Sequence, residues 1–117
     1  MNVLYFDGRE TDGKGYYNKP TDTMILDAYL DDIDKRKVTF HEYGHKDHSK
    51  EFYKLNREKA EQEADRYMIH NLLVEYLSSL DDKTEFNVSR FMDAYRLKTI
   101  ANEVMVIDEY YNLLDAV

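Results

Sequence analysis

Glycine and proline are concentrated at the start of this 117-residue chain, and their uneven distribution constrains the fold most strongly. Three of the four glycines (Gly8, Gly13 and Gly15) and the only proline, Pro20, lie within the first 20 residues. Because these residue types favour turns and interrupt helices, the first 30 residues are expected to form short strands joined by loops. The rest of the chain has the pattern of helices. The sequence therefore predicts an α+β protein, a small sheet followed mostly by helices.

Three short apolar runs in the first 30 residues predict the strands. They are Val3–Phe6, Tyr16–Tyr17 and Thr23–Ala28. A polar loop with two Asp-Gly turn signals separates the first two runs, and a turn over Asn18–Asp22 separates the last two. Because the runs are so closely linked, we expect a small antiparallel three-stranded sheet.

Capping residues indicate where the first helices begin. Asp31 or Asp32 is the expected N-cap of a first helix that runs to about Lys46. Ser49 or Asn56 then caps a further helical segment.

A long helix is expected to extend to about Ser79, since its apolar residues recur at intervals of three and four. After a loop, Asn87 can cap a short helix and Thr99 can cap the last one. The last helix carries an apolar stripe of Ile100, Val104, Ile107, Tyr111 and Leu114.

The composition excludes several classes of protein. The absence of cysteine excludes a thiol nucleophile, a disulfide framework and a zinc site built on sulfur. With 24 acidic against 16 basic residues, the net charge of −8 argues against direct binding to a nucleic-acid backbone. No apolar run approaches the length of a membrane span, and the N-terminus lacks the pattern of a secretory signal. We therefore expect one cytoplasmic domain over residues 1–117 that has no membrane partner.

Residues 41–45 read His-Glu-Tyr-Gly-His, which is the HExxH pattern of zinc peptidases. Four residues advance about 400° along a helix, so His41 and His45 share one face of the predicted first helix and can bind one metal ion. Glu42 flanks the same site, where it can accept a proton from a water molecule on the metal. The alternative is a chance pentamer on a solvated helix.

A catalytic zinc usually keeps three protein ligands, so a third ligand must come from outside the motif. Without cysteine, it is a histidine, an aspartate or a glutamate. Glu61 and Asp65 lie four residues apart on the next helix and share a face. Glu61 can complete the ligand set, and Asp65 can accept the other ring proton of His41. Glu63 points elsewhere and is the weaker candidate, and the alternative for the whole cluster is a solvated acidic face. Zinc is the default ion, although manganese or iron can bind the same nitrogen and oxygen ligands.

Other residues near the motif have less specific roles. His48 would lie about one turn away from a metal held by the motif, so we expect it to contact substrate or lie in a loop rather than act as a ligand. His70 is expected to point away from the metal. Ala60 and Ala64 are small enough for close packing of the long helix on the first. A tyrosine could stabilise the oxyanion of a tetrahedral intermediate, but the sequence does not indicate which of the 11 would do so.

Two stretches together resemble the ImmA/IrrE family of metallo-endopeptidases from bacteria, phages and integrative elements. They are Phe40-His41-Glu42-Tyr43-Gly44-His45 and Glu61-Gln62-Glu63-Ala64-Asp65-Arg66-Tyr67. The family pairs an HExxH helix with a downstream E-x-E-A-(N/D)-x-aromatic helix. The resemblance covers roughly residues 15–80, and the family's proline-containing stop after the second helix is missing here.

The resemblance implies a mostly helical, zincin-like domain with the HExxH motif on its first long helix. It implies that His41, His45 and Glu61 bind Zn²⁺ and that Glu42 is the general base. It also implies a protein substrate, a separate helix-turn-helix repressor of a phage or mobile element that the enzyme would cleave as an anti-repressor. We therefore predict a zinc metallo-endopeptidase. Two alternatives are a non-catalytic, metal-containing binding module or toxin-like partner that sequesters a regulator, and a helical interaction protein without metal.

Overall fold

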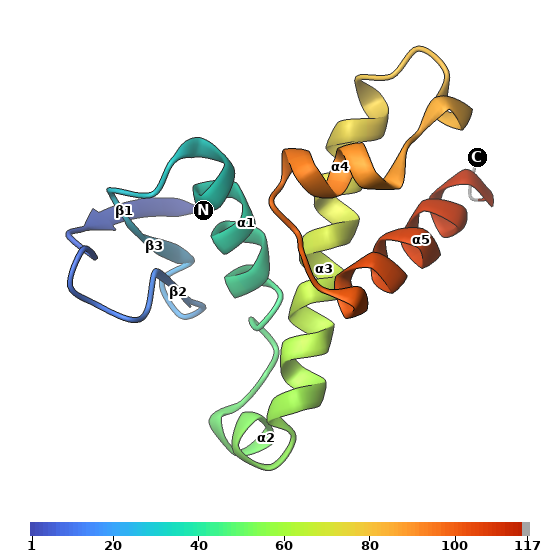
Figure 1. Cartoon of the computed structure of the whole chain (residues 1–117). Helices are drawn as coiled ribbons and strands as arrows, with labels where there is room; N and C mark the ends of the chain where they lie inside the picture. Colours follow the sequence, from blue (N-terminus) through green and yellow to red (C-terminus); the bar gives the residue numbers. More distant parts are fainter. Residues whose placement is uncertain (116–117) are drawn as a thin grey trace. The chain divides into compact units, whose positions relative to one another are not determined.

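The computed structural model describes residues 1–115, and Figure 1 shows the order of their strands and helices. The chain divides into two compact units, Met1–Tyr67 and a second unit that begins at Met68. The long helix α3 (Arg57–Ser78) starts in the first unit and ends in the second. A small sheet followed by helices confirms the predicted α+β class, whereas the single domain over residues 1–117 and the zincin-like fold stay predictions. Among the described residues, no helix is both long and apolar enough to cross a bilayer.

The first unit begins with the strands β1 (Asn2–Phe6), β2 (Gly15–Asn18) and β3 (Thr23–Asp27), close to the predicted positions. The expectation of a purely antiparallel sheet is wrong. The strand order is β1-β3-β2, and β3 pairs antiparallel with β2 but parallel with β1. A connection that passes over one strand spans about 10 Å. Residues 7–14 reach further than this, so they are long enough for β1 and β2 to lie at opposite edges of the sheet, as they do, instead of pairing as a hairpin.

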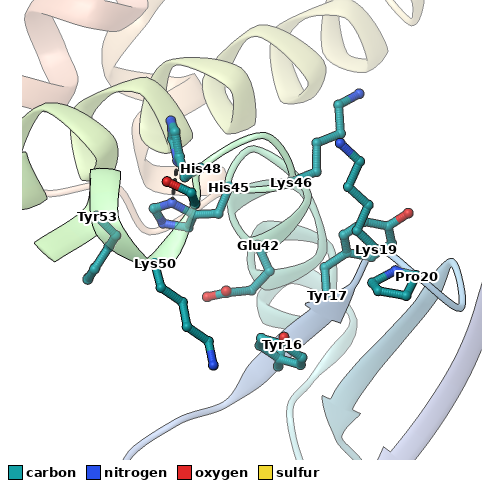
Figure 2. Close-up of a pocket in the computed structure, with 11 residues that line it drawn as sticks. Tyr16, Tyr17, Lys19, Pro20, Glu42, His45, Lys46, His48, Lys50 and Tyr53 are labelled. Atoms are coloured by element: carbon teal, nitrogen blue, oxygen red, sulfur yellow. Dashed lines mark hydrogen bonds between the residues drawn. The ribbon is translucent and has the colours of Figure 1, made fainter.

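Two short helices follow the sheet in the first unit. Helix α1 (Asp32–Tyr43) begins at the predicted N-cap Asp31, whose carboxylate accepts the N–H of Asp34. It packs on β2 and β3, so that Glu42 and Tyr16 line one pocket (Figure 2). Helix α2 (Lys50–Leu55) is capped by Ser49, and α3 starts after Asn56.

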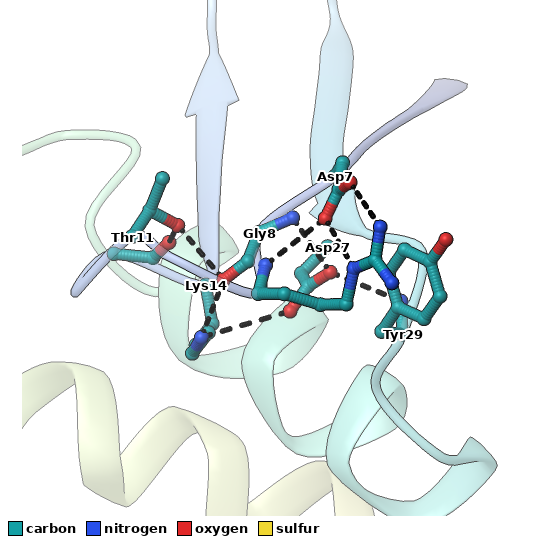
Figure 3. A network of polar contacts seen from close by, with 8 residues as sticks. Asp7, Gly8, Thr11, Lys14, Asp27 and Tyr29 are labelled. Carbon is teal, nitrogen blue, oxygen red and sulfur yellow. Dashed lines mark hydrogen bonds and ion pairs between the residues drawn. The ribbon is translucent and has the colours of Figure 1, made fainter.

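Asp27 ends the central strand and anchors the loop after β1 (Figure 3). Its Oδ1 accepts the backbone N–H groups of Gly8 and Tyr29, each at 3.0 Å, and Lys14 Nζ lies 3.7 Å from its Oδ2. The N–H of Tyr29 is the main cause that lowers the pKa of Asp27, and Gly8 and Lys14 act in the same direction against the effect of burial. The buried carboxylate is therefore ionised and ties residues 7–14 to the end of β3.

The second unit contains the later part of α3, the 3₁₀ turn η1 (Lys83–Glu85), α4 (Val88–Ala94) and α5 (Ile100–Asp115). Both predicted caps are confirmed, because the side chain of Asn87 accepts the N–H of Arg90 and the hydroxyl of Thr99 accepts the N–H of Asn102. The face of α5 that is buried differs from the apolar stripe. Its buried residues are Met105, Val106 and Tyr110, whereas Ile100, Val104, Ile107 and Tyr111 are exposed.

Candidate metal centre

The HExxH motif lies at the carboxyl end of α1. The helix ends at Tyr43 rather than near Lys46, so His41 and Glu42 lie on its last turn and His45 lies in the turn that follows. The chain stays tightly wound there, because the N–H of His45 donates to the carbonyl of Glu42 at 3.1 Å. The rings of His41 and His45 consequently remain neighbours, with 4.9 Å between their centroids.

Gly44 allows the end of α1 to approach the backbone of α3 closely. A Cβ atom at Gly44 would lie 2.9 Å from the Cα of Ala64 and 3.2 Å from its carbonyl oxygen. Ala60 and Ala64 are fully buried, and the close approach at Ala64 confirms the predicted packing of small residues on the first helix. Glu61 and Asp65 flank Ala64 in α3, and the close approach brings both carboxylates to the histidines.

Three side chains place potential ligand atoms around one point. His41 Nε2 lies 3.3 Å from His45 Nε2 and 3.0 Å from Glu61 Oε2. His45 Nε2 lies 3.3 Å from Glu61 Oε1. A tetrahedral ion with bonds of about 2.0 Å separates its ligand atoms by about 3.3 Å. The spacing of His41, His45 and Glu61 therefore fits an ion of the size and geometry of zinc, with the fourth position left for water or substrate.

The hydrogen bond of His41 supports the same interpretation. His41 Nδ1 lies 2.8 Å from Asp65 Oδ1, so the carboxylate of Asp65 accepts a hydrogen bond from the Nδ1–H of the ring. In neutral His41 the Nε2 lone pair then faces the Nε2 of His45 and the carboxylate of Glu61. This concentration of electron pairs is unfavourable unless a cation or a proton lies among them. Asp65 thus makes the contact with His41 that the sequence predicts for it.

The electrostatic environment differs between the two histidines. Burial lowers the pKa of His41, but the hydrogen bond and charge of Asp65, together with other carboxylates, raise it above its ordinary value. Burial and the charge of His41 lower the pKa of His45, which favours the neutral imidazole that binds metals. Burial raises the pKa of Glu61, but the hydrogen bond from Tyr53 and the two histidines lower it overall. Glu61 is therefore ionised, as a metal ligand must be.

Tyr53 is the site residue that sequence reasoning missed. It lies on α2, and its hydroxyl donates to Glu61 Oε1 at 2.7 Å. Its ring meets that of His45 edge to face, with 5.6 Å between centroids. Among 11 tyrosines, no spacing or motif distinguishes this one, because its role depends on how α2 folds back toward α3.

Glu42 lines a pocket of about 360 Å³ beside the cluster (Figure 2). His45 and Tyr53 line the same pocket, and Tyr16 and Tyr17 of β2 complete another side. Burial raises the pKa of Glu42, and the charge of Glu61 adds to this effect although His41 opposes it. A carboxylate with a raised pKa next to a metal position is a stronger proton acceptor than an ordinary glutamate.

The other histidines and Glu63 do not contribute to the cluster of three proposed metal ligands. His48 is not one of the three residues whose ligand atoms converge, and its Nδ1 instead lies 2.9 Å from His45 Nδ1. Glu63 contacts His48 Nε2 at 2.7 Å instead of the proposed metal position. His70 pairs with Glu109 at 3.0 Å in the second unit.

Comparison with models of known protein families gives a match. The model of the peptidase M78 family, described as the IrrE N-terminal-like domain, matches residues 1–98. No curated protein and no solved structure matches the chain significantly. The family match spans both halves of the candidate centre, the HExxH segment and the Glu61–Asp65 segment. The chain therefore belongs to the ImmA/IrrE family of metallopeptidases.

Proposed function

We propose that this protein is a zinc-dependent endopeptidase that hydrolyses a peptide bond in a protein substrate. The observation that carries the proposal is the convergence of His41, His45 and Glu61 at ligand spacing, next to the pocket that contains Glu42. Membership of a peptidase family supports the same reaction class. Two imidazoles and a carboxylate are a common ligand set of catalytic zinc, and we choose zinc over manganese or iron on this ground.

In the proposed mechanism, three residues bind the metal ion and a fourth transfers the proton. His41, His45 and Glu61 would hold the ion, which when bound supplies Lewis-acid polarisation of the scissile carbonyl and of a water molecule. Glu42 accepts a proton from this water at a carboxylate oxygen while the water oxygen bonds to the carbonyl carbon. It then delivers the proton to the amide nitrogen as the carbon–nitrogen bond breaks. The raised pKa of Glu42 strengthens its carboxylate as the base of the first transfer.

We propose that the substrate backbone lies along β2. Within residues 1–115, β2 pairs only with β3, which leaves its outer edge available for hydrogen bonds. Tyr16 and Tyr17 of this strand line the pocket with Glu42. An extended segment that pairs with β2 by strand addition would therefore cross the pocket and bring its carbonyl groups to the metal position.

For the substrate we propose a separate helix-turn-helix repressor of a phage or mobile element, which cleavage would inactivate. Support for this part comes from the resemblance of the HExxH and Glu61–Tyr67 segments to the ImmA/IrrE family. The anti-repressor role follows if the regulator is encoded beside this protein.

The test combines metal analysis with a cleavage assay. Purified parent protein should contain or take up about one zinc per chain, and His41→Ala and Glu61→Ala should lose it. The zinc-loaded parent should cleave the neighbouring helix-turn-helix regulator, with product termini defined by mass spectrometry. Glu42→Gln should retain zinc and lose turnover, and full cleavage by this variant would refute the assigned base. Capture of the regulator without cleavage would favour the sequestering module instead.

A further inference from the structure

A chain of hydrogen bonds leads from a surface carboxylate to His45. His45 Nδ1 lies 2.9 Å from His48 Nδ1, and His48 Nε2 lies 2.7 Å from Glu63 Oε2. The side chain of His48 is only 9% exposed, and its ring stacks on Phe52 at 5.2 Å with an interplanar angle of 12°. The backbone turn that positions His48 is closed by its own N–H, which donates to the carbonyl of His45 at 2.9 Å.

These contacts determine which nitrogen of each ring carries its proton. A carboxylate can only accept, so in a neutral His48 ring the Nε2 that contacts Glu63 carries the proton and Nδ1 is left as an acceptor. His45 must then donate from Nδ1, and its Nε2 lone pair is directed toward His41 and Glu61. The reverse assignment would place a proton on His45 Nε2, where it would block metal binding.

An ordinary surface ion pair would not produce this arrangement. In such a pair the second nitrogen of His48 would face water, whereas here it contacts a proposed ligand and the ring is largely buried. Asp65 acts directly on His41 Nδ1, but no carboxylate of α3 contacts the Nδ1 of His45, which instead is joined to Glu63 through His48. One proposed histidine ligand is therefore oriented directly by a carboxylate, and the other is oriented by a second histidine that itself contacts a carboxylate.

We propose that His48 and Glu63 are positioning residues of the metal centre, which fix the tautomer and the ring orientation of His45. This inference rests on the metal site of the proposed function. Partners of this kind typically change metal affinity by about 10- to 100-fold when they are replaced.

The structure offers a matched control for the test. Glu63→Gln removes the charge that contacts His48, and Glu109→Gln makes the same change at the His70–Glu109 pair in the second unit. In competition with a chromophoric chelator, Glu63→Gln should bind zinc about 10- to 100-fold more weakly than the parent, whereas Glu109→Gln should bind it equally well. His48→Ala should show a similar loss. His48→Asn should recover part of the affinity, because the amide oxygen can accept from His45 Nδ1.

Long-range ¹H–¹⁵N spectra of the four histidines supply a readout that does not depend on activity. In the zinc-loaded parent, His48 should be the Nε2–H tautomer, and His45 should carry its proton on Nδ1. Unchanged zinc affinity in both Glu63→Gln and His48→Ala, or a His48 proton on Nδ1, would overturn the inference. A parent that binds zinc with these tautomers but cleaves nothing would refute only the peptidase function. A parent that binds no zinc would overturn both proposals.

Discussion

Gly44→Ala adds a methyl group where α1 and α3 leave no room for one. The new Cβ would lie 2.9 Å from the Cα of Ala64, 3.2 Å from its carbonyl oxygen and 3.1 Å from the carbonyl oxygen of His41. All three are backbone atoms, so no side-chain rotation can relieve the contact. The end of α1 must instead move away from α3, and the move would separate His45 from Glu61.

Two opposing effects set the size of the change in stability. Gly44 has φ −62° and ψ −18°, which alanine adopts readily, so the lower entropy of the unfolded chain would stabilise the variant by about 0.4–1 kcal/mol. Overpacking against well-packed atoms costs about 1–3 kcal/mol, and contact with backbone points to the upper half of that range. The free energy of unfolding should therefore fall by about 1–2.6 kcal/mol.

Gly13→Ala is the matched control, because no atom lies within 4 Å of its added Cβ and no glycine has a positive φ. Urea unfolding should show a loss of stability for Gly44→Ala and a neutral or slightly stabilising effect for Gly13→Ala. Zinc affinity should fall only in Gly44→Ala. If Gly44→Ala were as stable as Gly13→Ala and bound zinc as the parent does, the close approach of the helices would not be what assembles the centre.

Three further predictions concern other single residues. Asp65→Asn replaces the carboxylate that contacts His41 Nδ1 with a neutral amide, so zinc affinity in chelator competition should fall by about 10- to 100-fold, and no loss would show that the ring needs no charged partner. Tyr53→Phe removes the hydroxyl that lowers the pKa of Glu61, so zinc binding should weaken more at pH 6 than at pH 8, and an equal effect at both would contradict this role. The pKa of Asp27 is lowered in the folded state, chiefly by the N–H of Tyr29, so its contribution is present above the unfolded pKa of about 3.9 and is lost as pH falls through the folded value. The urea midpoints of Asp27→Asn and the parent should therefore differ more at pH 7 than at pH 3, and a constant difference would refute the linkage.

Much of the secondary structure could be predicted because its signals are local. Asp31, Asn87 and Thr99 cap helices by accepting N–H groups three residues later, which is a contact that the sequence itself places. Strand pairing has no such local determinant. The parallel pairing of β1 with β3 depends on the path of residues 7–14, and nothing in their turn signals distinguishes a hairpin from a connection that passes over a strand.

The part of the candidate site that could be predicted is the part that depends on spacing within one helix. His41 with His45, and Glu61 with Asp65, are separated by four residues, so each pair shares a face before any tertiary contact forms. The contacts of Tyr53 and His48 could not be predicted in the same way. They depend on the early end of α1 and on the turn that leads to α2, and no periodicity in residues 44–49 encodes this path.

The early end of α1 has a chemical consequence. If α1 continued, His48 would be displaced about 4.5 Å along the helix axis from His45, and its ring would follow the helix away from the cluster. The turn instead brings its Nδ1 back to 2.9 Å from the Nδ1 of His45. Each of the three proposed ligands then has its own partner, since Asp65 contacts His41, the His48–Glu63 pair holds His45, and Tyr53 contacts Glu61. Because these partners act on different ligands, removing one should loosen a single bond to the ion, whereas removing a ligand eliminates that bond.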